Sequence, residues 1–157
     1  MKPRLYLETT IPSYLTSRPS RDLIVAGHQQ VTREWWEQRR HAFHLYISQL
    51  VVDEASAGDP AAARERLKVI QDLPLLDITL EVEALASHIL ASGIIPRKAA
   101  TDAAHIAVAA VHGLDFLVTW NCVHIANASI AKAVAKVCGQ HGYEGPGICT
   151  PEELLEE

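Results

Sequence analysis

Short apolar runs alternate with longer segments of helical periodicity along this chain. Five runs have strand character: 4–7, 42–47, 75–78, 114–118 and 148–149. Helical spacing of apolar residues fills the gaps between them, and Ser48 and Thr79 are predicted to cap two of these helices. Strands that alternate with such helices are typical of a parallel sheet covered on both faces. The pattern therefore predicts one α/β domain over residues 1–157, with a central, mostly parallel sheet of four or five short strands.

The most informative segment is 100–113, which consists almost entirely of small and apolar residues. This composition predicts a helix that is buried on nearly every side. Asp102 is its acidic residue and stands near its start, so it either caps the helix or binds a cation. Gly113 ends the helix, and the apolar run that follows stops abruptly at Thr119 and Asn121.

Length, composition and charge restrict the class of protein. The chain has 157 residues, 48% of them hydrophobic and 21% charged, and no apolar run approaches the roughly 18 residues of a membrane span. The net charge of −5 argues against passive binding to nucleic acid, but it permits an enzyme that holds phosphates through cations. Cys122, Cys138 and Cys149 form no CxxC pair, and strand-like residues follow Met1 almost directly. We therefore expect a cytoplasmic protein with reduced cysteines, no secretory signal and no membrane contact.

Four polar side chains are expected at one end of the predicted sheet. Glu8 follows the first strand, and Glu54 lies in the helix after the second. Asp102 opens the buried helix, and Asn121 follows the next strand. Ligands of open parallel sheets bind just beyond the carboxyl ends of the strands. Three carboxylates gathered in a half-buried cleft repel one another, so they require protons or a divalent cation, and hard oxygen ligands favour Mg²⁺ or Mn²⁺.

Each of these residues also has a structural interpretation. Glu8 and Asn121 could be turn residues, whereas Glu54 could face solvent. Asp102 could cap its helix. Thr119 either orients a water molecule or a neighbouring carboxylate, or bonds to the backbone at the end of its strand.

Histidine and cysteine offer rival chemistry in the same region. Cys122 and His124 could form a nucleophile and its base, but no oxyanion-hole signature accompanies them. His105, one turn after Asp102, could reach the cleft, although packing inside the helix is the more common role for such a histidine. The histidine and cysteine spacings match no zinc site, and the chain has no phosphate-binding glycine loop.

Four segments match, in order, the motifs of a known family: 5–10, 51–59, 101–107 and 117–121. They resemble those of a PIN domain, the metal-dependent nuclease fold found in VapC-type toxins of toxin–antitoxin pairs. The third segment, Thr-Asp-Ala-Ala-His-Ile-Ala, is the most specific, and the resemblance covers most of the chain. It implies a PIN-like three-layer α/β/α fold.

The resemblance also implies a function. The chain would be an Mg²⁺- or Mn²⁺-dependent endoribonuclease, a hydrolase of RNA phosphodiester bonds and the toxin of a type II toxin–antitoxin pair. Glu8, Glu54 and Asp102 would bind the ion, and Asn121 would complete the site as a further ligand or hydrogen-bond to it. Thr119 would join these four residues in the catalytic set.

The implied partners are an RNA substrate, an antitoxin protein that blocks the cleft, and a second copy of the chain. Trp35 and Trp36 are expected in the core or at such a dimer interface. Glu8 and Asn121 stand where the family usually has aspartate, and they resemble a Glu-Thr-Thr/Thr-Trp-Asn subset of it. Because Asn121 removes a charge, a weakened or inactive PIN-like binding module is the alternative.

Overall fold

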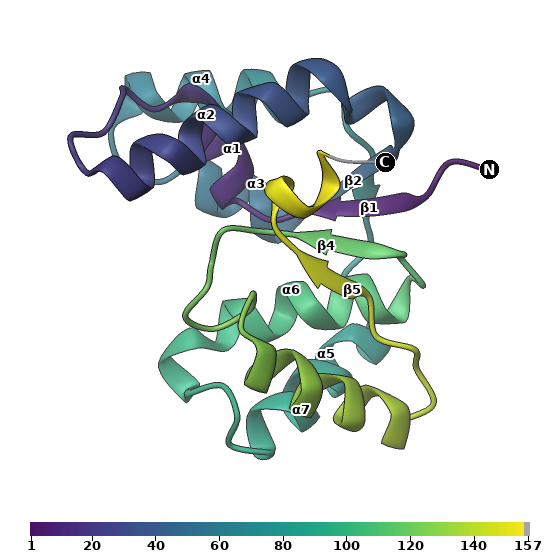
Figure 1. Ribbon diagram of the computed structural model, residues 1–157. Coiled ribbons are helices and arrows are strands. Elements are labelled where there is room, and N and C mark those ends of the chain that lie inside the picture. Colours follow the sequence, from purple (N-terminus) through teal and green to yellow (C-terminus); the bar gives the residue numbers. More distant parts are fainter. Residues whose placement is uncertain (156–157) are drawn as a thin grey trace.

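The protein, described over residues 1–155 by a computed structural model, is a three-layer α/β/α structure (Figure 1). The described residues form five strands: β1 (Arg4–Leu7), β2 (His44–Ser48), β3 (Leu75–Leu76), β4 (Phe116–Val118) and β5 (Gly147–Cys149). The same residues form seven α-helices: α1 (Thr10–Thr16), α2 (Leu23–Gln38), α3 (Gln49–Ala55), α4 (Pro60–Ile70), α5 (Leu80–Ala91), α6 (Ala100–Val111) and α7 (Ala128–Gln140). Three short 3₁₀ helices complete the list: Arg40–Ala42, Arg97–Ala99 and Pro151–Leu154.

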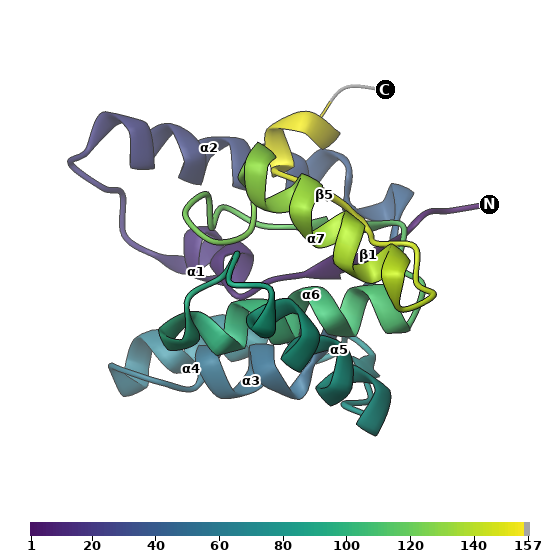
Figure 2. The same cartoon turned by 90° about the horizontal axis from the view of Figure 1, so that it is seen from below.

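The sheet has the strand order β3-β2-β1-β4-β5, and every pair of neighbours is parallel. The predicted α/β class is thereby confirmed, with a sheet that is parallel throughout the described residues. Helices α5, α6 and α7 cover one face, and α1 and α2 lie on the other (Figure 1). In the view from below, α7 crosses in front of strands β1 and β5 (Figure 2).

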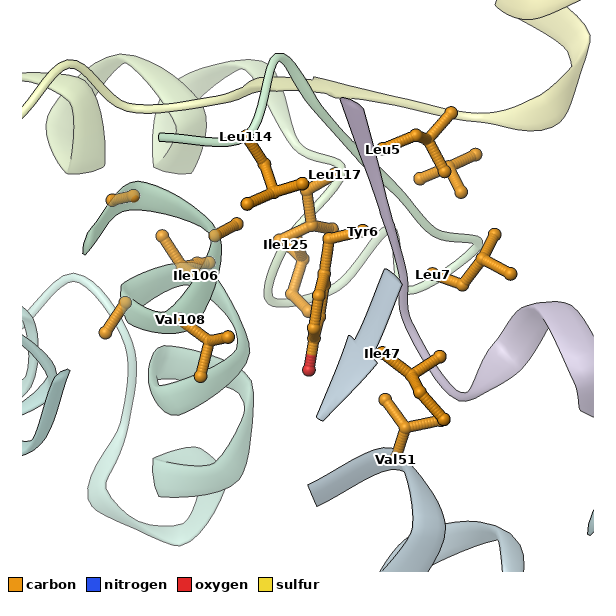
Figure 3. Close-up of a cluster of buried hydrophobic side chains, with 14 of the residues drawn as sticks. Leu5, Tyr6, Leu7, Ile47, Val51, Ile106, Val108, Leu114, Leu117 and Ile125 are labelled. Carbon is orange, nitrogen blue, oxygen red and sulfur yellow. The ribbon is translucent and has the colours of Figure 1, made fainter. Parts of the chain in front are cut away.

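The core lies on both faces of the central strands, against helix α6 on one face and against α1 and α2 on the other. Side chains alternate along β1, so Tyr6 points to one face of the sheet while Leu5 and Leu7 point to the other (Figure 3). All three are fully buried, as expected of the middle strand of a sheet covered on both sides. Helix α6 is buried along most of its length, as its composition predicts, and its small residues allow close packing on the sheet.

Several local predictions can be compared with the structure. Thr79 caps α5 by accepting the amide of Val82, as predicted. The prediction that Ser48 caps α3 is wrong, because its hydroxyl makes no capping hydrogen bond. Trp35 is fully buried in the core, which excludes it from a dimer interface, whereas Trp36 is partly exposed. No helix of the described residues is long and apolar enough to cross a bilayer.

Candidate functional site

The strand order reverses at β1 and β4, and this is where polar side chains gather. From β1 the chain builds outward through β2 and β3, and it then returns to add β4 and β5 on the other side. In open parallel sheets, the carboxyl ends of strands at such a reversal are the usual place for a ligand. Glu8 directly follows β1 and Thr119 directly follows β4, and the Glu8 amide donates to the Val118 carbonyl over 3.1 Å.

Glu8 is a buried carboxylate that the protein holds by one of its two oxygens. The residue is only 4% exposed. Oε1 accepts the Thr10 amide at 3.0 Å, the Thr10 hydroxyl at 2.5 Å and the Thr119 hydroxyl at 2.7 Å. Oε2 has no hydrogen-bond partner among residues 1–155. The Thr119 hydroxyl thus orients a carboxylate, and it also accepts the backbone amide of Asn121, so both interpretations predicted for Thr119 are present in the structure.

Glu54, near the end of α3, is also held by one oxygen, although its side chain is partly open to solvent, with 37% of it exposed. Oε1 accepts the Thr9 hydroxyl at 2.6 Å and lies 2.6 Å from Nε2 of His105. Burial favours the neutral acid, but the hydrogen bond and charge of His105 and the Thr9 hydroxyl outweigh it and lower the pKa of Glu54. Glu54 is therefore ionised at neutral pH and can only accept, so Nε2 of His105 donates to it. Its other oxygen has no hydrogen-bond partner within the described part of the chain.

Asp102 lies in the first turn of α6 but does not cap the helix. The capping position belongs to Ala99, and no side chain makes a capping hydrogen bond there. Instead, Oδ2 of Asp102 lies 3.0 Å from Nδ1 of His124, which comes from the loop after β4. Its Oδ1 has no hydrogen-bond partner within residues 1–155. Of the two interpretations of Asp102, the helix cap is therefore wrong.

Asn121 shapes the loop that carries His124. Its side-chain Oδ1 accepts the His124 amide at 3.0 Å, and its own amide donates to the Thr119 hydroxyl at 2.9 Å. This is the turn-forming role weighed for asparagine at that position. A ligand role for Asn121 remains a prediction.

The structure brings Glu8 and Glu54 together with His105. One ligand atom from each of the three lies within 4.8 Å of the others. Among the described residues Asp102 does not belong to this group, so the structure brings two of the three predicted carboxylates together. The sequence favoured a packed role for His105, and the residue is indeed fully buried, yet its ring also contacts the carboxylate cluster. The signal that could have placed it there is its spacing from Asp102, because residues three apart on a helix share a face.

Other contributors to the site were not predicted from the sequence. Thr9 and Thr10 directly follow Glu8 and donate to the two glutamates. Their adjacency to the first acid was the available signal, but either hydroxyl could equally have capped α1. The sequence pointed to His124 through its neighbour Cys122, as a base or a zinc ligand, and not as a partner of Asp102.

The rival nucleophile pair is not supported by the geometry. Burial and the nearby Glu153 carboxylate raise the pKa of the Cys122 thiol, whereas an activated nucleophile needs a lowered one. Nδ1 of His124 faces Asp102 instead. A separate cavity of about 520 Å³ lies at the amino ends of β1 and β2, between Lys2 and His44, and shares no residue with the carboxylate cluster.

The donor set of the cluster fits a hard divalent cation. Glu8 and Glu54 in this cluster, and Asp102 outside it, each give one oxygen to a protein partner and keep one without a hydrogen-bond partner in residues 1–155. Carboxylate oxygens are the ligands that Mg²⁺ and Mn²⁺ prefer. His105 has both ring nitrogens at hydrogen-bond distance from protein oxygens, so we assign it a supporting role rather than coordination.

Comparison with known proteins gives no family for this chain, since no protein-family model and no curated protein matches it. The function of the chain is therefore inferred from the hydrogen bonds and the donor chemistry of the cluster.

Proposed function

We propose that this chain is a metal-dependent ribonuclease of the PIN type, with Mg²⁺ or Mn²⁺ held by Glu8, Glu54 and Asp102. The observation that carries the proposal is the shared state of these three carboxylates. Each is fixed through one oxygen and leaves the other without a hydrogen-bond partner in the described residues. A cation bound by these oxygens would offset the repulsion between Glu8 and Glu54, which lie in one group, and Asp102 would join it as a third ligand.

The cation and the threonines beside the glutamates would have different roles in such a site. When bound, the cation would lower the pKa of an attacking water and offset the negative charge that develops on a phosphodiester. Thr119 holds Glu8, and Thr9 holds Glu54, so the free oxygens of both glutamates keep fixed positions. Fixed donors and acceptors lower the cost of reorganisation during the reaction.

A basic pair supports an anionic substrate. Arg97 and Lys98 form the 3₁₀ turn directly before α6, and both are exposed. They therefore stand just ahead of the helical turn that carries Asp102. In a chain with a net charge of −5, this local positive charge offers RNA phosphates a route to the acidic cluster.

RNA cleavage with a matched variant tests the proposal. Purified protein is incubated with a panel of structured and single-stranded RNAs and Mn²⁺, with EDTA as a control, beside Asp102→Asn. We expect EDTA-sensitive cleavage that the variant reduces by about 100-fold, because loss of an ion ligand removes several kcal/mol of transition-state stabilisation. Equal cleavage by both proteins, or no cleavage of any RNA, contradicts the proposal.

The biological setting follows as part of the same proposal. A cytoplasmic toxin would be blocked by an antitoxin that covers the carboxylates, and toxin copies would pair as a homodimer. A small neighbouring gene for a DNA-binding antitoxin would favour this setting, and co-purification with its product tests it.

A second candidate function is a PIN-like binding module that does not cleave. One observation favours it: Asn121 is neutral where a fourth carboxylate is expected, and its oxygen already accepts the His124 amide. Mn²⁺ and RNA binding without cleavage would identify this second function.

A further inference from the structure

A chain of buried hydrogen bonds runs from the core to Glu54. The Tyr6 hydroxyl lies 2.7 Å from the Ser48 hydroxyl and 2.7 Å from Nδ1 of His105. Nε2 of the same histidine lies 2.6 Å from Oε1 of Glu54. Tyr6, Ser48 and His105 are each 0% exposed, so this chain is shielded from water. Figure 3 shows the Tyr6 ring between α6 and β2, with its hydroxyl at the far end.

Local structure alone does not explain these hydrogen bonds. Ser48 occupies the capping position of α3, and Thr9 occupies that of α1, where serine and threonine hydroxyls normally accept a backbone amide. Neither makes a capping hydrogen bond. Ser48 bonds to Tyr6, and Thr9 donates to Glu54. Helices α1 and α3 thus lack a side-chain cap. The Thr9 hydroxyl bonds directly to Glu54, and the Ser48 hydroxyl bonds to Tyr6, which contacts the histidine beside Glu54. Departures from a local rule of this kind are expected at functional positions.

The contact between His105 and Glu54 determines which atoms of the hydrogen-bond chain donate. An ionised carboxylate only accepts, so Nε2 of His105 carries a proton in both charge states of the ring. If the ring is neutral, Nδ1 accepts the Tyr6 O–H, and Ser48 donates to Tyr6. If the ring is charged, Nδ1 donates to Tyr6, and Tyr6 donates to Ser48. Two hydroxyls in series can satisfy either state, so the ring keeps one orientation toward Glu54.

We propose that Ser48, Tyr6 and His105 are positioning residues that fix the Glu54 carboxylate for cation binding. The proposal rests on the function proposed above, because it takes Glu54 as an ion ligand. His105 donates to Oε1 and thereby fixes the Glu54 carboxylate, whose other oxygen has no hydrogen-bond partner in residues 1–155. Tyr6 holds the histidine ring in turn, and Ser48 holds the tyrosine hydroxyl. Outer partners of this kind orient the groups that bind the ion and do not touch it.

Tyr6→Phe is the sharpest test because it removes one oxygen and leaves the aromatic ring in place. Tyr46→Phe is the matched control: Tyr46 pairs in register with Tyr6 on the adjacent strand β2, but its ring lies under Arg4, outside this hydrogen-bond chain. Mn²⁺ affinity is measured by electron paramagnetic resonance, and the thermal midpoint in EDTA reports folding. We expect Tyr6→Phe to weaken Mn²⁺ binding by about 10-fold and Tyr46→Phe to leave it unchanged.

Two histidine variants separate positioning from packing. His105→Gln keeps a side-chain N–H near the place of Nε2 and should retain most of the Mn²⁺ affinity. His105→Asn is shorter, cannot reach Glu54, and should lose as much affinity as Tyr6→Phe or more. Equal losses in the two variants, with equal thermal midpoints, would show that the ring only fills space and would overturn the proposal.

A metal-free readout separates failure of this proposal from failure of the proposed function. Nitrogen-15 NMR of labelled histidine reports which nitrogens of His105 carry protons. In EDTA we expect a protonated Nε2 in one fixed ring state, and a mixture of tautomers in Tyr6→Phe. If the wild type shows this ordering but binds no Mn²⁺, the ion site fails while the hydrogen-bond chain stands. If Tyr6→Phe changes neither the NMR signature nor the Mn²⁺ affinity, the positioning proposal is wrong.

Discussion

Replacing Thr119 with valine tests the hydrogen bonds that hold Glu8. Thr119 is fully buried; its hydroxyl donates to Oε1 of Glu8 at 2.7 Å and accepts the amide of Asn121 at 2.9 Å. Valine has nearly the same shape, so no cavity forms. Loss of a hydrogen bond to a charged group costs about 1.5–3 kcal/mol, and an amide without a partner adds about 1 kcal/mol. We therefore expect Thr119→Val to lower the free energy of unfolding by about 3 kcal/mol.

Urea denaturation in EDTA measures this loss without any contribution from a cation. The expected change corresponds to a thermal midpoint about 6–12 °C lower for a chain of this size. Thr16→Val is the control, because the Thr16 hydroxyl bonds only to the Pro12 carbonyl of its own helix at 2.9 Å, and we expect a change below about 1 kcal/mol. If Thr119→Val stays within about 0.5 kcal/mol of the wild type, the hydrogen bonds assigned to Glu8 are wrong.

Three further predictions concern stability and reactivity. Leu117→Ala removes a fully buried side chain from β4 and should cost about 3 kcal/mol in urea denaturation; a loss below about 1 kcal/mol would contradict its place in the core. The pKa of Glu54 is lower in the folded than in the unfolded protein, so ionised Glu54 should stabilise the fold fully at neutral pH and lose that effect as pH falls through its folded pKa. If the free energies of unfolding of the wild type and Glu54→Gln differ as much at acid pH as at neutral pH, this prediction is wrong. Alkylation of the native protein near neutral pH, read by mass spectrometry, should modify exposed Cys122 before Cys138 and Cys149, because burial raises the pKa of Cys149 to about 12; early labelling of either buried thiol would contradict the packing.

Much of the architecture follows from short-range patterns in the sequence. The alternation of short apolar runs and helical segments indicated a parallel sheet, since short apolar runs bounded by turn residues favour strands over helices. The small residues of α6 indicated its burial, and the position of Glu8 after the first strand placed it at the carboxyl edge. These features depend on neighbours in sequence, so the sequence alone can report them.

The hydrogen bonds of the site could not be predicted in the same way. The Tyr6 hydroxyl meets a residue 42 positions away and another 99 positions away, and no local rule links them. Ser48 and Asp102 show the consequence, because local rules predicted a cap for Ser48 and allowed one for Asp102, yet tertiary partners engage both side chains. His105 appeared as an ordinary packed residue because its contact with Glu54 exists only after α3 and α6 meet.

Direct titration of the metal-free protein with Mn²⁺ is the measurement that bears most directly on the cation site. The three carboxylates that each keep one oxygen without a hydrogen-bond partner among residues 1–155 predict saturable binding near neutral pH. Asp102→Asn, which removes one charged ligand but can keep a hydrogen bond to His124, should bind Mn²⁺ at least about 10-fold more weakly. Absence of measurable Mn²⁺ binding to the wild type, or equal affinity in Asp102→Asn, would contradict the account.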